Sequence, residues 1–303
     1  MCVSPWKRIY IFCPLNFEVR FGNTHSCQCA QSIMRLRKII IIILIPVLVW
    51  LITKYVLRPP NVRTLSSHFA HKRIAMIIAH PDDEAMFFGP TLNALRQLAI
   101  QTNLGSPALP ETNLRILCLS TGNADSLGET RTGELRSSAA HFGIPPSNVI
   151  IFDDPRVQDR MGVKWPTDAI ASLVGPYLTD VDVVITFDNG GVSGHGNHIS
   201  LNSFAREFLS GQGEIQREVW MLKSTSVLRK YVSFLDIPYT YVSNHFFNSN
   251  SKTERSLVLV SDVREYANTR DAMTQGHKSQ MRWFRWGWIS LSRYMVVNDL
   301  HLL

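Results

Sequence analysis

The chain has 303 residues, which suffice for a short extension and either one sizeable domain or two small ones. Hydrophobic residues make up 45% and charged residues 18%, which excludes general disorder. Its 31 Lys and Arg against 24 Asp and Glu give a formal net charge of +7, spread along the sequence. No zinc-finger spacing, recognition-helix pattern or aromatic RNA-binding motif accompanies this charge, so we expect no nucleic-acid partner. Four of the five cysteines fall within the first 29 residues, which is typical of a body folded in a reducing compartment.

A long apolar run lies near the N-terminus. From Ile39 to Ile52 it has no polar side chain over 14 residues, and with the next five residues it reaches about 28 Å as a helix. With Trp50 near an interface, this run predicts a single transmembrane anchor over residues 35–58. A cleaved signal peptide beginning at Met34 is an alternative, although no small-residue cleavage site follows, and a buried core helix is another. Basic residues flank the run on both sides, so charge leaves its orientation open.

The remaining chain divides into three parts. Residues 1–34 show no periodic pattern and are expected to form a disordered extension, whereas residues 59–73, which open with two prolines, are expected to be a linker. Residues 74–303 are predicted to form one domain.

Apolar strands alternate with amphipathic helices along this domain. Strands are predicted at 74–79, 116–119, 149–152, 181–187 and 257–260. Helices are predicted at 88–99, 135–142, 201–209, 262–275 and 278–296, with a loop at 100–113. The alternation predicts an α/β fold, Rossmann-like, with three αβα layers and a mainly parallel sheet, in addition to the N-terminal transmembrane helix.

The first predicted strand ends in His80-Pro81-Asp82-Asp83-Glu84, which places four ionisable groups within five residues. Carboxylates this close repel one another, and a cation bound among them relieves the repulsion. We expect His80 and Asp83 to converge on one metal ion and Asp82 to remain available as a base. The alternative is a solvated turn whose aspartates cap a helix.

A second cluster follows the 181–187 strand, where a glycine-rich segment carries His195 and His198 before the next helix. Glycines let the backbone pass close to a ligand. Ligands of open α/β sheets bind beyond the carboxyl ends of the strands, and both clusters lie there. A single His-x-x-His is a weak signal, but two such clusters in one sheet indicate a site.

The chemistry of these side chains suits a metal hydrolase. Catalytic zinc usually has three protein ligands and a water, and His80, Asp83 and His198 supply such a set, which also suits other divalent first-row ions. Asp82 is then predicted to take a proton from the water, and His195 to donate to the oxyanion or the leaving amine. The pattern therefore predicts metal-assisted hydrolysis of an amide or ester.

Other catalytic patterns fit less well. The segment around Ser193 lacks the second glycine of a nucleophile elbow, and Cys118 lies inside a predicted strand, which indicates a core residue. The sequence has no Walker loop and no intact dinucleotide glycine fingerprint.

Residues 79–84 (Ala-His-Pro-Asp-Asp-Glu) and the Gly194-His195-x-x-His198 motif resemble those of the LmbE-like, or PIG-L, de-N-acetylase family. Segments similar to its eukaryotic members are 122–125, 128–135, 190–195, 279–285 and 292–295. The resemblance covers about residues 70–303 and the apolar run before them. Gly133 departs from the pattern, since a charged or larger residue is common there, and this puts the local helix geometry in question.

The resemblance implies a metal-dependent hydrolase that removes the N-acetyl group from N-acetylglucosaminylphosphatidylinositol (GlcNAc-PI) in the second step of GPI-anchor biosynthesis. It further implies a single-pass protein of the endoplasmic reticulum membrane with its catalytic domain facing the cytosol. The residues matching the family's site are His80, Asp83 and His198 as metal ligands, and Asp82 and His195 as catalytic residues. Arg131 matches a substrate-binding arginine; its alternative is a helix-surface arginine paired with Glu134.

The implied partners are a glycolipid substrate and the bilayer that holds it. Two other functions stay open: a deacetylase of a soluble GlcNAc conjugate, and a non-catalytic membrane scaffold of the same fold. The intact candidate ligands favour an enzyme. The basic and aromatic stretch Arg282–Ile289 is predicted either to lie in the lipid headgroup layer or to pack as an aromatic helix of the core.

Overall fold

The structure is a computed structural model that describes residues 24–52, 65, 68–102, 113–160, 162–209, 217–247 and 256–303. The chain divides into two compact units, Met1–Leu48 and Val49–Leu303. Of the predicted segments, residues 1–23 of the extension, 53–58 of the anchor, most of the 59–73 linker and 103–112 of the loop lie outside the described residues.

Helix α1 spans Thr24–Ile52, so residues 24–34 of the predicted extension are helical rather than disordered. Within the described residues, no helix combines the length and the apolar character required to cross a bilayer, and the predicted transmembrane helix over 35–58 is not found.

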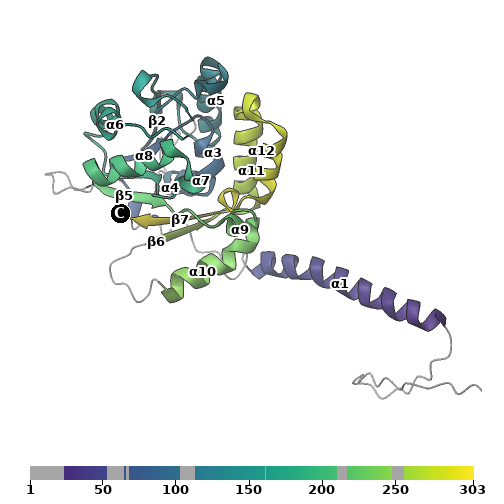
Figure 1. Ribbon diagram of the computed structural model, residues 1–303. Helices are drawn as coiled ribbons and strands as arrows, with labels where there is room; N and C mark the ends of the chain where they lie inside the picture. Colours follow the sequence, from purple (N-terminus) through teal and green to yellow (C-terminus); the bar gives the residue numbers. More distant parts are fainter. Residues whose placement is uncertain are drawn as a thin grey trace, which may run out of the picture. The chain divides into compact units, whose positions relative to one another are not determined.

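One mixed sheet organises the second unit (Figure 1). In the part of the chain that the structure describes, its seven strands run in the order β3-β2-β1-β4-β5-β7-β6. Neighbours among the first five are parallel, and β7 is antiparallel to both β5 and β6. The strands are β1 Ile74–Ile78, β2 Leu114–Cys118, β3 Val149–Ile151, β4 Val183–Phe187, β5 Glu218–Leu222, β6 Ser256–Val260 and β7 Val297–Leu302. The prediction of a mainly parallel α/β sheet is confirmed.

The sequence pattern missed two strands, β5 and β7. The apolar part of β5 is only four residues long, after a leading Glu218. In β7, the buried Asn298 and Asp299 interrupt the apolar pattern. Asn298 is paired nevertheless, because its Oδ1 accepts from the Thr91 N–H and hydroxyl and its Nδ2 donates to the Phe87 carbonyl.

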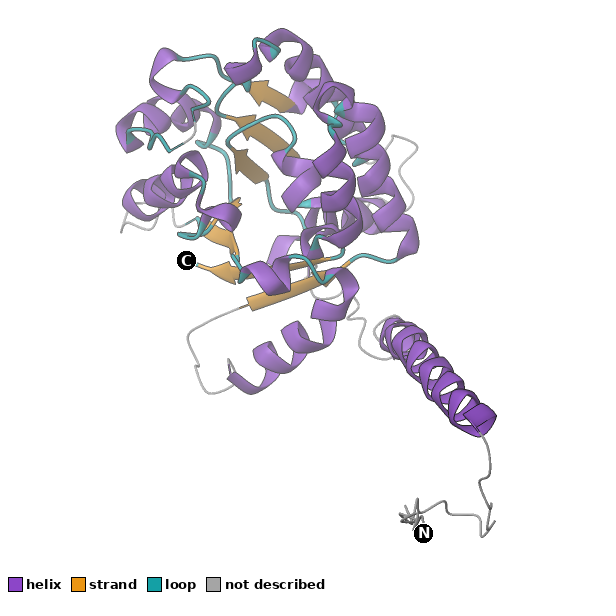
Figure 2. Ribbon diagram, turned by 45° about the vertical axis from the view of Figure 1, so that its right-hand side comes forward, coloured by secondary structure: helices purple, strands orange, loops and turns teal. Residues whose placement is uncertain are grey.

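Helices lie on both sides of the sheet (Figures 1 and 2). Within the described residues, these helices are α3 Asp83–Phe87, α4 Gly89–Thr102, α5 Gly128–His141, α6 Thr167–Val174, α7 Gly191–Gly194, α8 Gly196–Phe204, α9 Val227–Lys230, α10 Asp236–Phe247, α11 Val263–Asp271 and α12 Trp283–Leu291. Helix α6 packs against α8, and α4 and α5 pack against α11. The predicted helix over 278–296 is shortened to α12, because Arg282 and Ser292 at its two ends have extended backbones.

Strands β1 and β4 position the site. Both are buried along their whole length, as expected for parallel strands covered on both faces. They are neighbours, with Ile74 opposite Val183 and Met76 opposite Ile185. Their carboxyl ends therefore meet at one edge of the sheet, and the segments that follow them lie side by side there.

Candidate active site

The turn after β1 is held by its own carboxylates. Oδ2 of Asp83 accepts the backbone N–H groups of Ala79 and His80, both at 2.9 Å. Asp82 has a φ of 115°, a left-handed conformation that costs free energy for a residue other than glycine. Glu84 lies beneath the turn, fully buried, and its Oε2 accepts the Asp82 N–H at 3.2 Å.

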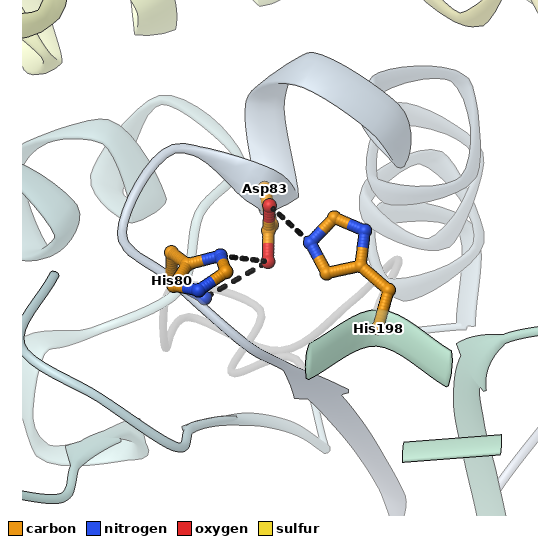
Figure 3. A group of neighbouring side chains, drawn as sticks. All are labelled: His80, Asp83 and His198. Atoms are coloured by element: carbon orange, nitrogen blue, oxygen red, sulfur yellow. Dashed lines mark hydrogen bonds and ion pairs between the residues drawn. The ribbon is translucent and has the colours of Figure 1, made fainter. Parts of the chain in front are cut away.

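The predicted metal ligands come together (Figure 3). His80 Nδ1 lies 3.7 Å from Asp83 Oδ2, and His198 Nε2 lies 3.3 Å from Asp83 Oδ1. One ligand atom from each residue lies within 4.8 Å of the others, and all three side chains are buried. His80 and Asp83 follow β1, whereas His198 lies in the first turn of α8 beyond β4.

Outer partners orient both imidazoles. His198 Nδ1 lies 3.1 Å from the Gly191 carbonyl, which fixes the proton on Nδ1 and leaves the Nε2 lone pair facing Asp83. His80 Nε2 lies 3.1 Å from the Asn197 amide oxygen, so its Nδ1 is the nitrogen that faces Asp83. Ligand histidines in metal sites are held in this way by a hydrogen bond from the second ring nitrogen.

The donor set fits a divalent cation. His198 Nε2 is buried and has no hydrogen-bond partner, although it faces a carboxylate. Burial lowers the pKa of His80, but the Asp159 and Asp83 carboxylates more than offset this effect and raise it to about 10. Burial raises the pKa of Asp83, but the charges of His198 and His80 outweigh it, and the pKa falls well below its usual value. The electrostatics thus favour positive charge at the centre of the cluster, which a metal ion supplies.

The predicted base, Asp82, lies at the rim of this cluster. The residue is buried, and its Oδ2 is 2.7 Å from Arg285 Nη2 and 3.4 Å from Arg131 Nη2. Two guanidinium groups therefore converge on one carboxylate oxygen. The sequence did not indicate Arg285 as part of the site, because it comes from α12, more than 200 residues away along the chain.

The second predicted catalytic residue, His195, caps α8. Its Nδ1 accepts the Asn197 backbone N–H at 3.3 Å, which places the ring proton on Nε2. Its ring centroid lies 4.9 Å from those of both His80 and His198. Burial, together with the charges of these two histidines, lowers the pKa of His195 to about 4. The half-buried ring is therefore a neutral N–H donor at neutral pH.

Arg131 is not the helix-surface residue of the alternative interpretation. It is 7% exposed and donates to the carbonyl oxygens of Gly122 at 2.8 Å and Pro81 at 2.6 Å. Glu134, its supposed partner, instead accepts from the Ser279 N–H and hydroxyl. Arg131 thus ties the segment after β2 to the turn after β1.

Asp159 is a site residue that the sequence analysis missed. Its carboxylate lies 3.3 Å from His80 Nε2 and 3.7 Å from Arg131 Nη1, and His80, Asp159 and His195 form a second group with metal-ligand geometry. Burial raises the pKa of Asp159, but the hydrogen bond and the charge of His80 outweigh burial, and the pKa falls below its usual value. A signal was available, since acidic residues follow β3 just as they follow β1.

A polar cavity of about 480 Å³ adjoins the site at Asp159. Its lining comes from the segments that follow β2 and β3, and it includes Ser120, Thr121, Asn123, Asp153 and Arg160. Hydroxyl, amide and carboxylate groups of this kind hydrogen-bond to polyhydroxylated ligands.

Known proteins resemble this chain over most of its length. The family model "PIG-L: GlcNAc-PI de-N-acetylase" matches residues 75–209. A probable N-acetylglucosaminyl-phosphatidylinositol de-N-acetylase of Schizosaccharomyces pombe is 40% identical over 235 residues, with 76% of this chain and 87% of the relative covered. The Bos taurus enzyme of that name is 37% identical, covering 76% and 83%, and that of Arthroderma benhamiae is 35% identical, covering 76% and 87%. The chain therefore belongs to the PIG-L family of de-N-acetylases.

Proposed function

We propose that this chain hydrolyses the acetamide of GlcNAc-PI with the help of a divalent ion held by His80, Asp83 and His198. One observation carries the proposal: three buried ligand atoms converge at the edge of the sheet, with a carboxylate and an imidazole N–H beside them. The substrate is inferred from the names of the relatives, which are 35–40% identical to this chain. An open-position site of two histidines and one aspartate suits zinc and also other first-row ions.

When bound, the divalent ion supplies Lewis acidity, which polarises the acetamide carbonyl and lowers the pKa of water. Asp82 accepts the proton of the attacking water; Arg285 and Arg131 hold its Oδ2, which leaves Oδ1 for this proton. The arginines also fix the carboxylate in place, so little reorganisation accompanies proton transfer.

His195 stabilises the developing oxyanion. Because its Nδ1 accepts a backbone N–H, its Nε2–H is the group left to donate to the carbonyl oxygen as that oxygen gains charge. Preorganised donors of this type contribute about 10²–10³-fold to rate. The depressed pKa of His195 keeps the ring neutral before the reaction. The amine of glucosamine then leaves, after taking the proton from Asp82.

For the rest of the substrate we propose that the polar cavity beside Asp159 receives the glucosamine and inositol rings. Arg131 serves substrate binding through this carboxylate: its Nη1 lies 3.7 Å from Asp159 Oδ2. The activity belongs to GPI-anchor biosynthesis, and we place the enzyme at the cytosolic face of the endoplasmic reticulum membrane, where its glycolipid partner lies.

The test is release of acetate from GlcNAc-PI by membranes carrying the full chain, beside the Asp82→Asn variant. We expect chelation to abolish release, divalent metal to restore it, and Asp82→Asn to lower it about 10²–10⁴-fold. Equal rates for wild type and Asp82→Asn would remove Asp82 as the base. No release by either form, with metal bound, would reject GlcNAc-PI as the substrate.

A further inference from the structure

Exposed apolar side chains of the second unit gather on two short segments. In the described residues, α9 exposes Val227 at 71% and Leu228 at 77%, and the chain after it and α10 expose Tyr231, Leu235, Tyr239 and Val242. Helix α12 exposes Trp283 at 86%, together with Phe284, Trp286 and Leu291. A monomeric soluble surface rarely presents such a group, and large exposed patches mark a binding surface.

The two segments adjoin each other. Tyr231 after α9 packs edge-on against Trp288 of α12, with ring centroids 5.8 Å apart. In Figure 1, α9 and α12 both lie on the right-hand side of the domain. We call Val227, Leu228, Tyr231, Trp283, Phe284 and Trp286 the docking face.

Helix α12 has two unlike sides. Trp288 and Ile289 are buried, and Trp288 stacks on Tyr294 and donates its indole N–H to the Met86 carbonyl. Trp283 and Trp286, three residues apart, share the opposite, exposed side. One side of this stretch therefore packs on the core, as one of the two interpretations expects, and the other side is exposed.

The composition of the face identifies that partner as lipid. Trp and Tyr are the residues that concentrate at membrane–water interfaces, because each has an apolar body and a polar tip. Neither 226–235 nor 281–297 contains an acidic residue, while both contain Arg or Lys. The arginines of these segments are paired, Arg282 with the exposed Asp125 and Arg229 with Asp236, so the aromatic side chains rather than the net charge indicate lipid.

The face also connects directly to the site. Arg285, on the same helix as Trp283 and Trp286, reaches Asp82 at 2.7 Å. Trp288 contacts Met86 in α3, the helix that begins at Asp83. A lipid whose acyl chains stay in the bilayer beneath α12 would thus present its headgroup at the turn after β1.

We propose that the docking face inserts into the headgroup layer of a phospholipid bilayer and holds the active site against it. This inference rests on the proposed function for its lipid substrate, but insertion itself is measurable without turnover. The occupant is the bilayer surface, and a partner protein is the outcome that would replace it.

The first test is fluorescence of the full chain reconstituted in vesicles of phosphatidylcholine and phosphatidylinositol with brominated acyl chains, which quench nearby indoles. Comparison of wild type with the double variant Trp283→Phe and Trp286→Phe isolates these two indoles from the other tryptophans. We expect brominated lipid to quench a smaller fraction of the emission in the double variant than in wild type, because the two indoles in contact with lipid are gone. The buried control Trp165→Phe should remove only emission that the lipid does not quench. If the double variant behaves like this control, the face lies in water and the proposal is overturned.

The second test compares two substrates. The double variant Trp283→Ser and Trp286→Ser should lower kcat/KM for GlcNAc-PI in vesicles by at least about tenfold and leave turnover of the lipid-free GlcNAc-inositol phosphate headgroup unchanged. Phe208→Ser, another exposed aromatic, is the matched control. An equal loss on both substrates would overturn docking. If wild type turns over neither substrate, the proposed function fails, and the quenching result still decides whether the face inserts.

Discussion

The two turns that build the site are stabilised in different ways. The turn after β1 depends on distant elements: Glu84 Oε1 accepts from His277 Nε2 at 2.6 Å and from the Ser138 hydroxyl at 2.5 Å. Burial lowers the pKa of His277, but Glu84 outweighs this effect and raises it. Glu84, which accepts the N–H of the strained Asp82, is thus held by a fully buried ion pair with His277 from the C-terminal third of the chain.

The segment after β4 is instead stabilised from two neighbouring strand ends, by Asp188 directly after β4 and by Ser224 after β5. Asp188 Oδ1 accepts the N–H groups of Gly190 at 3.0 Å and Gly191 at 3.1 Å, and Ser224 on the neighbouring segment completes the cap. Gly191 has a φ of 53°, which glycine adopts without strain, and a Cβ there would meet His198 at 3.0 Å.

The difference teaches where each half of the site is vulnerable. Substitutions far away along the chain should loosen the turn that carries the proposed base and two of the proposed ligands. The segment that carries His195 and His198 should respond chiefly to substitutions at the neighbouring strand ends, at Asp188 and Ser224.

The largest effect is expected from Glu84→Ala, which leaves His277 buried without its carboxylate. We predict a fall in the free energy of unfolding of about 3–5 kcal/mol, the usual cost of removing one partner from a buried pair. Urea unfolding of the detergent-solubilised chain measures it, with the exposed Glu129→Ala as control. A loss no larger than that of the control would show that the turn after β1 is not held from a distance.

A smaller effect is expected from Asp188→Ala. The hydrogen bonds of Asp188 to Gly190 and Ser224 are only partly buried, so water can replace some of them in the variant. Loss of its acceptor oxygens should lower the free energy of unfolding by about 2 kcal/mol. It should also weaken metal binding, since the Gly191 carbonyl that orients His198 belongs to the capped segment. Metal titration of the variant checks this, and unchanged affinity would mean that His198 does not depend on the cap.

The smallest effect, and the only gain, is expected at Gly133. It lies on the exposed side of α5, and a Cβ added there meets nothing within 4 Å. Gly133→Ala should therefore raise the free energy of unfolding by about 1 kcal/mol through helix propensity, with acetate release unchanged. A destabilised variant would contradict the regular helix found here, the point that the sequence left in question.

The sequence predicted those parts of the candidate site that directly follow the carboxyl ends of apolar strands. His80, Asp83 and His198 could be grouped because each follows a recognisable apolar strand, and neighbouring parallel strands end at one edge of a sheet. The same rule applied to β3 points to the acidic segment that follows it, which contains Asp153, Asp154 and Asp159.

Other parts of the site had no local signal. Arg285 and His277 reach the turn after β1 only through tertiary packing of the C-terminal segment. Strand β7 was missed because its buried Asn298 and Asp299 interrupt the apolar pattern. Asn298 hydrogen-bonds to Thr91 and to the Phe87 carbonyl, and Asp299 lies 3.8 Å from Lys223 Nζ, which no periodic pattern shows.

The most direct test of the metal-dependent account is the metal content of the purified full chain, measured by mass spectrometry for wild type, Asp83→Ala and Asp82→Asn. The account predicts one divalent ion per chain in wild type, loss of the ion in Asp83→Ala, and retention in Asp82→Asn with acetate release nearly abolished. Equal metal content in wild type and Asp83→Ala would contradict the assignment of the ligands. Full activity in metal-free wild type would contradict the mechanism itself.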